Sequence, residues 1–94
     1  KVVKIQGYRV DLNDIENNLR KINVVEDVIV YLKKKFNSQI LLCAIKSKNL
    51  KKEDYIIKKL SEKLPNYMIP KKVRIYKNFP LNRSGKTDRK KIMI

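Results

Sequence analysis

Two near-continuous apolar runs in the middle of the chain constrain its fold more than any other feature. They span Val24 to Tyr31 and Gln39 to Lys46, and both are rich in the β-branched and bulky apolar residues that favour strands. The polar segment Lys33 to Ser38 between them predicts a turn, which makes the two strands antiparallel neighbours. Strands with so few polar positions are typical of the centre of a sheet, so helices must cover this sheet.

The chain before these strands predicts a ribbon and a helix. Residues Lys1 to Leu12 read as two short strands around a turn at Gln6-Gly7. The helix is expected over Asn13 to Ile22, because Ile15, Leu19 and Ile22 form one apolar stripe. Asn13 is the expected N-cap, and Glu16 follows it at the spacing of a capping box. We expect Glu16 to act through helix N-terminal electrostatics.

The chain after the central strands predicts a longer helix, a connector, a third strand and a terminal helix. Apolar spacing favours a helix over Lys51 to Leu64 with Pro65 as its stop, and the apolar connector Pro65 to Pro70 should pack on the body. Alternation predicts a strand over Lys72 to Tyr76. Thr87 or Asp88 can cap a last short helix through Arg89 and Ile92.

This order, ββ-α-β-β-α-β-α, predicts an α+β fold: a two-stranded ribbon, and a small antiparallel or mixed sheet with helices on its faces. We divide the 94 residues into the ribbon 1–12, an α/β body 13–79, and a loop with a terminal helix 80–94. The length suits one small domain or a piece of a longer protein, and the abrupt strand-like start favours the piece.

Residue usage excludes several classes of site. The sequence has no histidine, which removes most zinc sites and every Ser-His or Cys-His mechanism. The lone Cys43 lies in an apolar run and is interpreted as a buried strand residue. No run approaches the roughly 18 apolar residues that span a membrane, so we expect no membrane partner and a cytoplasmic location.

The formal charge of +15 predicts attraction to acidic partners. A stand-alone basic module for nucleic acid or an acidic protein is therefore one hypothesis. Nucleic acid is the weaker partner, because the basic residues are scattered and lysine outnumbers arginine, the usual reader of base edges.

The stretch from Pro80 to Lys90 presents one lysine on a turn. Gly85 permits a tight backbone turn, and Lys86 follows it as a compact positive charge suited to a phosphate or carboxylate. Pro80 to Thr87 fits P-x-x-x-x-G-K-T, close to a phosphate-binding P-loop. A P-loop is excluded because Pro80 has no amide hydrogen to give, and because only seven residues follow Thr87.

Three motifs in order resemble signatures of the adenylate-forming (ANL) enzymes. The motifs are Lys4 to Glu16 (KIQGYRVDLNDIE), Leu64 to Pro70 (LPNYMIP) and Pro80 to Arg89 (PLNRSGKTDR). The resemblance covers nearly the whole chain. It implies the small C-terminal lid domain of such an enzyme, with a large N-terminal domain that holds the acid pocket and most of the site for ATP and Mg²⁺. The hinge residue of the family would lie before Lys1.

For the first half-reaction, the resemblance implies that Lys86 contacts the substrate carboxylate as it joins the α-phosphate of ATP. Gly85, Ser84 and Arg83 complete this substrate and ATP loop. A desolvated ammonium would stabilise the negative charge that gathers where carboxylate meets phosphate.

For the second half-reaction, the resemblance implies that Gly7, Tyr8 and Arg9 line a tunnel for a phosphopantetheine thiol. Packing of Tyr8 on the domain itself, and pairing of Arg9 with a local acid, are the structural alternatives. The implied partners are the N-terminal domain, a carboxylic or amino acid and an acidic carrier protein, with no metal held by this domain. The motifs lean toward amino-acid adenylation domains and D-alanine–carrier-protein ligases, with acyl-CoA synthetases as the alternative.

Overall fold

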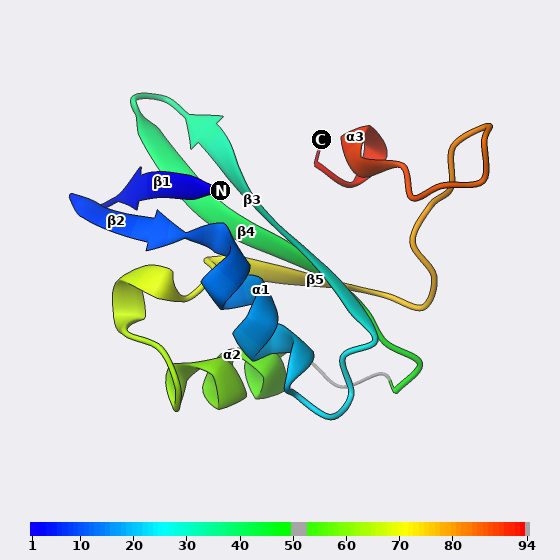
Figure 1. Cartoon of the computed structure of the whole chain (residues 1–94), viewed down its shortest axis with the longest axis horizontal. Coiled ribbons are helices and arrows are strands. Elements are labelled where there is room, and N and C mark those ends of the chain that lie inside the picture. The colour runs from blue at the N-terminus through cyan, green and yellow to red at the C-terminus, as the bar shows by residue number, and fades with distance from the viewer. Residues whose placement is uncertain (50–52, 94) are drawn as a thin grey trace.

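The computed structural model describes residues 1–49 and 53–93 and has the predicted order of elements (Figure 1). The strands are β1 (Val2–Ile5), β2 (Tyr8–Asp11), β3 (Asp27–Lys35), β4 (Ser38–Lys46) and β5 (Lys72–Tyr76). The helices are α1 (Leu12–Arg20), α2 (Glu53–Ser61), the short 3-10 helix η1 (Asn66–Met68) and α3 (Arg89–Ile92).

The first two strands form the predicted antiparallel ribbon, in which Ile5 pairs with Tyr8 across a two-residue turn. Gln6 and Gly7 both have positive φ, at 50° and 84°. Such a turn matches the twist of paired strands and favours glycine, which explains the Gln6-Gly7 pair. Ile5 and Val10 are buried against the body, so the ribbon packs on the rest of the domain as expected.

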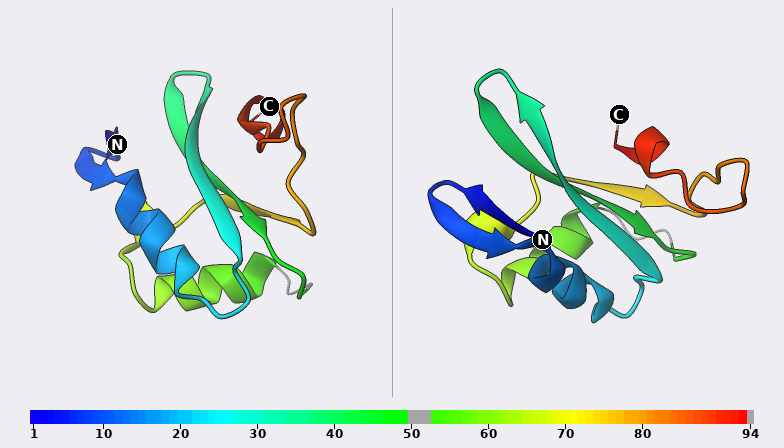
Figure 2. Two further views of the ribbon diagram at one scale, coloured as in Figure 1. Left: turned by 45° about the vertical axis from the view of Figure 1, so that its right-hand side comes forward. Right: turned by 45° about the horizontal axis from the view of Figure 1, so that its top comes forward.

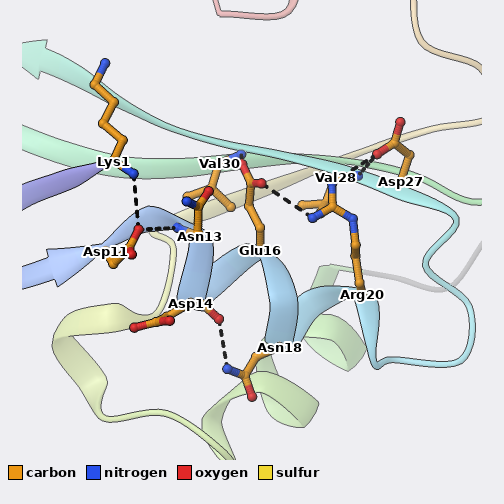
Figure 3. Close-up of polar contacts among 10 residues, drawn as sticks. All are labelled: Lys1, Asp11, Asn13, Asp14, Glu16, Asn18, Arg20, Asp27, Val28 and Val30. Carbon is orange, nitrogen blue, oxygen red and sulfur yellow. Dashed lines mark hydrogen bonds and ion pairs between the residues drawn. The ribbon is translucent and has the colours of Figure 1, made fainter.

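Helix α1 begins one residue earlier than predicted, and its N-cap is Asp11 rather than Asn13 (Figure 3). A carboxylate oxygen of Asp11 accepts a hydrogen bond from the Asn13 backbone N–H at 2.9 Å. The reason is geometric, because β2 ends at Asp11 and the helix begins at the next residue. Asp11 is therefore the residue with extended backbone that directly precedes the helix, which is the position of an N-cap.

The prediction for Glu16 at the helix N-terminus was also wrong. Its carboxylate accepts from the Val30 backbone N–H of β3 at 3.3 Å and pairs with Arg20 at 3.5 Å (Figure 3). Arg20 also lies 3.5 Å from the Asp27 carboxylate. Glu16 is therefore a link between α1 and the sheet, which sequence spacing alone does not reveal.

Strands β3 and β4 form the expected antiparallel hairpin, but both are longer around the turn than predicted. Lys35 pairs with Ser38, so the turn is reduced to Phe36 and Asn37. Residues Lys33 to Lys35 continue the strand although they are exposed, because their backbone groups pair with β4. Local polarity marked these residues as a turn, whereas strand pairing decides the outcome.

The third strand, β5, has the predicted bounds and lies parallel to β4, which makes the sheet mixed with the order β3-β4-β5. Helix α2 ends at Ser61, three residues before the predicted end, and its predicted start at Lys51 lies outside the described residues. The segment Pro65 to Pro70 contains η1 and packs on the core through Tyr67, Met68 and Ile69, as predicted.

The sheet separates two apolar clusters. The larger one lies under the ribbon, α1 and α2 and includes Val10, Ile15, Cys43 and Leu60. The smaller one lies on the opposite face, where α3 and the segment before it cover the sheet (Figure 2). Cys43 is 1% exposed, which confirms the predicted burial. Among the described residues, no helix has the length and apolar character to cross a membrane.

Candidate functional site

The loop that carries Lys86 is closed on itself by backbone hydrogen bonds. The Asn82 N–H donates to the Lys86 carbonyl at 2.8 Å, and the Asp88 N–H donates to the Pro80 carbonyl at 2.7 Å. An isolated bridge pairs Leu81 with Thr87. The loop is therefore a small hairpin with a defined shape.

The side chain of Asn82 fills the centre of this loop. Its Oδ1 accepts hydrogen bonds from the Ser84 N–H at 3.0 Å, the Ser84 hydroxyl at 2.8 Å and the Lys86 N–H at 3.1 Å. Sequence reasoning missed this role. The signal was present, because asparagine commonly accepts from backbone two residues ahead in turns.

Lys86 itself is exposed, as are Arg83, Ser84 and Gly85. Gly85 has a φ of 82°, so the predicted conformational role of this glycine is confirmed. Lys86 makes no ion pair with any residue that the structure describes. The loop thus holds the lysine backbone in place and leaves the ammonium available to an anion.

The loop is anchored to the sheet on both sides. Phe79 before it and Ile92 after it are buried in the smaller apolar cluster. The Tyr31 hydroxyl donates to the Ile92 carbonyl at 3.4 Å, and the Asp88 carboxylate accepts from the Lys91 N–H as the predicted cap of α3. The loop that carries the exposed Lys86 is consequently held to the sheet at both of its ends.

The turn of the ribbon has one position without a side chain, Gly7. A Cβ added to Gly7 would meet no heavy atom within 4 Å, so the space over this glycine is open to a ligand. Tyr8 is 53% exposed, and its ring stacks on Tyr67 with 3.9 Å between ring centroids. Packing on the domain is thus established for Tyr8, whereas Arg9 has no ion pair with a described residue.

The two predicted site segments are not brought together. The turn between β1 and β2 and the loop between β5 and α3 lie at opposite ends of the molecule in all three views (Figures 1 and 2). A single bound molecule of small size does not contact both. The arrangement suits two separate events on two faces of one domain.

The described residues contain no group of three His, Cys, Asp or Glu side chains that could hold a metal ion. Residues 80–87 carry no side-chain carboxylate. The next carboxylate in the sequence belongs to Asp88, and it caps α3. The loop is therefore equipped to contact an anion.

Comparison with known proteins agrees with these observations. Residues 14–86 match the family described as the AMP-binding enzyme C-terminal domain. A D-alanine–D-alanyl carrier protein ligase of Bacillus anthracis is 40% identical over 97% of the chain, and that of Bacillus mycoides is 39% identical over 97%. The chain spans about a fifth of the length of these relatives, 20% and 19%.

Solved structures share the fold. A holo four-domain nonribosomal peptide synthetase, bound to AMP and glycine, superposes with a TM-score of 0.78 at 35% identity, over 94% of this chain and 7% of that one. Klebsiella oxytoca NpsA, in complex with 3-hydroxyanthranilyl-AMSN, gives 0.80 at 26% identity, over 97% and 18%. The fold, the match over most of the chain and the placement of the glycine-lysine loop lead to one assignment: the chain belongs to the AMP-binding enzyme C-terminal domain family.

Proposed function

We propose that this chain is the mobile C-terminal lid of an ATP-dependent ligase that adenylates an amino acid or a related carboxylic acid and passes it to a carrier-protein thiol. One observation supports the proposal most. Two segments that are open to a ligand, the Lys86 loop and the Gly7 turn, lie at opposite ends of a domain of this family. The similarity to ligases named for D-alanine and a carrier protein supports a carrier rather than coenzyme A as acceptor.

In the first half-reaction, Lys86 would bring its ammonium to the carboxylate and the α-phosphate of ATP. An exposed cation on a rigid loop suits this task, because closure against the large domain would remove it from water at the moment when charge develops. Arg83, Ser84 and Gly85 would form the rest of the contact surface. ATP and Mg²⁺ would be held mainly by the large domain, since the loop 80–87 offers no carboxylate.

In the second half-reaction, the Gly7 turn would face the thiol arm of phosphopantetheine. The open space over Gly7 supports this, because an arm can pass close to the backbone there. Tyr8 would support the turn through its stack on Tyr67, and Arg9 would stand beside the arm's path. The lid would have to rotate to present this end, since it lies opposite the Lys86 loop.

The test uses the full-length enzyme and measures each half-reaction by itself. Lys86→Ala is expected to lower acid-dependent pyrophosphate exchange by roughly 10²–10³-fold, the usual effect of removing one charge-stabilising contact. Thioester formation from supplied acyl-adenylate should continue. Lys90→Ala, at an exposed lysine of α3, is the matched control. Equal loss of both steps in Lys86→Ala would contradict the division of labour.

Gly7→Leu should do the reverse, retaining pyrophosphate exchange and losing thioester formation. Gly7→Asn separates backbone strain from obstruction, because asparagine tolerates a positive φ better than leucine and is smaller. Unchanged thioester formation in Gly7→Leu would remove this turn from the thiol path.

Tight, salt-sensitive binding of DNA or RNA that does not depend on Lys86 would instead favour a basic binding module.

A further inference from the structure

The β3–β4 hairpin ends in an aromatic ring that the fold itself does not use. Phe36 is the first of the two turn residues, its φ is 55°, and it is 91% exposed. Glycine or asparagine is favoured at such a position, and a bulky residue is strained there. A residue with a strained backbone and an exposed ring does not stabilise the fold, which points to a contact outside the domain.

A groove of about 620 Å³ begins two residues from this ring. It lies between the β1–β2 turn, the start of β4 and the connector, and these three segments occupy the same end of the molecule (Figures 1 and 2). Gln6 lines it beside Gly7, and Ser38 lines it beside the hairpin turn. The groove therefore connects the Gly7 turn to the hairpin tip. Its apolar lining is Ile5, Ile40, Leu41, Ile57, Tyr67, Ile69 and Pro70.

The charged residues that line the groove or lie at the hairpin tip are all positive. Lys71 lines it, and none of its lining residues is acidic. At the hairpin tip Lys33, Lys34 and Lys35 are all exposed. Val30 belongs to the core cluster beneath the ribbon, so strand alternation places Lys34 on that same face of the sheet, the face of the groove. An occupant of this surface would meet apolar contacts surrounded by cations.

We propose that this surface, made of the groove together with Lys34 and Phe36 and called here the hairpin groove, docks the acidic carrier protein. The inference rests on the proposed function and names where its partner binds. A carrier that delivers its thiol to the Gly7 turn must place its body beside that turn. The hairpin groove is continuous with the turn, complementary in charge to an acidic carrier, and ends in a ring that can enter an apolar site on the carrier.

The experiment compares a protein acceptor with a small acceptor in the full-length enzyme. The acceptors are the holo D-alanyl carrier protein of a Bacillus relative and free pantetheine, with D-alanine as substrate. Phe36→Gly should raise the KM for the carrier by ~10-fold or more, as expected for loss of an aromatic anchor. The kcat, the rate with free pantetheine and pyrophosphate exchange should not change. Thermal stability should not fall, because glycine relieves the positive φ.

Charge reversal gives a second, independent measurement. Lys34→Glu and Lys71→Glu should each raise the carrier KM by roughly 3–10-fold and weaken its dependence on salt. Lys48→Glu makes the same charge change at an exposed position past the other end of β4 and should leave the KM unchanged.

The outcomes separate the two proposals. The wild type could exchange pyrophosphate and load the carrier while all variants have the same KM for the carrier. That result would overturn the docking surface and leave the proposed function intact. A wild type that does neither overturns the proposed function and the docking surface with it. If Phe36→Gly weakens binding to DNA or to phosphatidylserine vesicles while the carrier KM is unaffected, the surface serves another partner and the docking proposal is wrong.

Discussion

The side-chain oxygen of Asn82 accepts a hydrogen bond from the backbone N–H of Lys86 at 3.1 Å. The lysine backbone is thus held by a side chain four residues earlier in its own loop. These contacts lie within the loop itself, so the shape of the loop does not depend on another domain. Pre-organisation of this kind reduces the ordering that a transition state must otherwise impose.

Replacing Asn82 by alanine should loosen the loop without unfolding the domain. The change removes the acceptor of three hydrogen bonds, each with a net value of about 1 kcal/mol. We expect pyrophosphate exchange to fall ~10-fold, the effect of about 1.4 kcal/mol in the barrier, and the Lys86 amide to exchange hydrogen faster. Asn78→Ala, at an exposed asparagine before the loop, is the control. Normal exchange and normal activity in Asn82→Ala would show that the loop needs no internal acceptor.

The Tyr8–Tyr67 stack should stabilise the ribbon. Tyr67→Ala removes a ring that lies 3.9 Å from its partner, and aromatic pairs contribute about 0.5–1.5 kcal/mol beyond their buried area. The melting temperature should fall, and thioester formation should weaken more than pyrophosphate exchange, because the ribbon carries Gly7. Tyr67→Phe retains the ring and serves as the control. A Tyr67→Ala variant that affects both half-reactions equally would argue against a ribbon-specific role.

Cys43 should be unreactive in the folded protein. Burial is the main cause that raises the pKa of its thiol to about 12, with a smaller effect of Glu53. At pH 8 a thiol reagent should therefore label it only at the rate of unfolding. Cys43→Ser should cost ~1–3 kcal/mol through burial of a hydroxyl. Rapid labelling of the native protein at this position would contradict the buried strand assignment.

The same thiol gives a pH dependence of definite sign. Its pKa is raised on folding, so its contribution to stability is present below the ordinary value of 9.0 and is lost as pH rises toward about 12. The difference in melting temperature between the wild type and Cys43→Ala should shrink over that range. A difference that stays constant with pH would show that the thiol ionises equally in both states.

Asp11 should stabilise the domain at neutral pH and stop doing so in acid. The hydrogen bond from the Asn13 N–H is the main cause that lowers the pKa of this carboxyl. Its contribution is present above the ordinary pKa of 3.8 and is lost as pH falls through the lower folded value. Asp11→Ala should thus melt earlier than wild type at pH 7, and the two should converge in acid. Asp11→Asn, which keeps a cap acceptor, should fall between them.

The sequence predicted the elements well because apolar periodicity and strand propensity are local. The predicted boundaries of helices and strands were wrong where a contact with another part of the chain sets them. Lys33 to Lys35 have no apolar signal, yet pairing with β4 makes them strand. Asp11 and Asn13 are both good caps two positions apart, and the direct entry from β2 selected Asp11. Glu16 had a plausible local role that a contact with Val30 replaced.

The site residues were predictable in part for the same reason. Gly7 and Gly85 stand out because a turn requires a positive φ, and the structure has both. Lys86 is a candidate because of the motif that contains it, and its role in catalysis stays a prediction. The internal acceptor Asn82 and the stack of Tyr8 on Tyr67 depend on loop geometry and on packing between distant segments. The placement of the two segments at opposite ends is a property of the assembled fold, which no local pattern encodes.

The separation of the Lys86 loop from the Gly7 turn has a consequence for inhibitors. Under the proposed function, a compound that covers the Lys86 end would stop ATP consumption altogether. A compound that covers the Gly7 end would leave adenylation possible and the acyl-adenylate without its thiol acceptor. ATP would then be consumed only as fast as water hydrolyses the acyl-adenylate to the acid and AMP. Two ligands of one small domain would thus have different effects: one would prevent ATP use, and the other would separate ATP use from product formation.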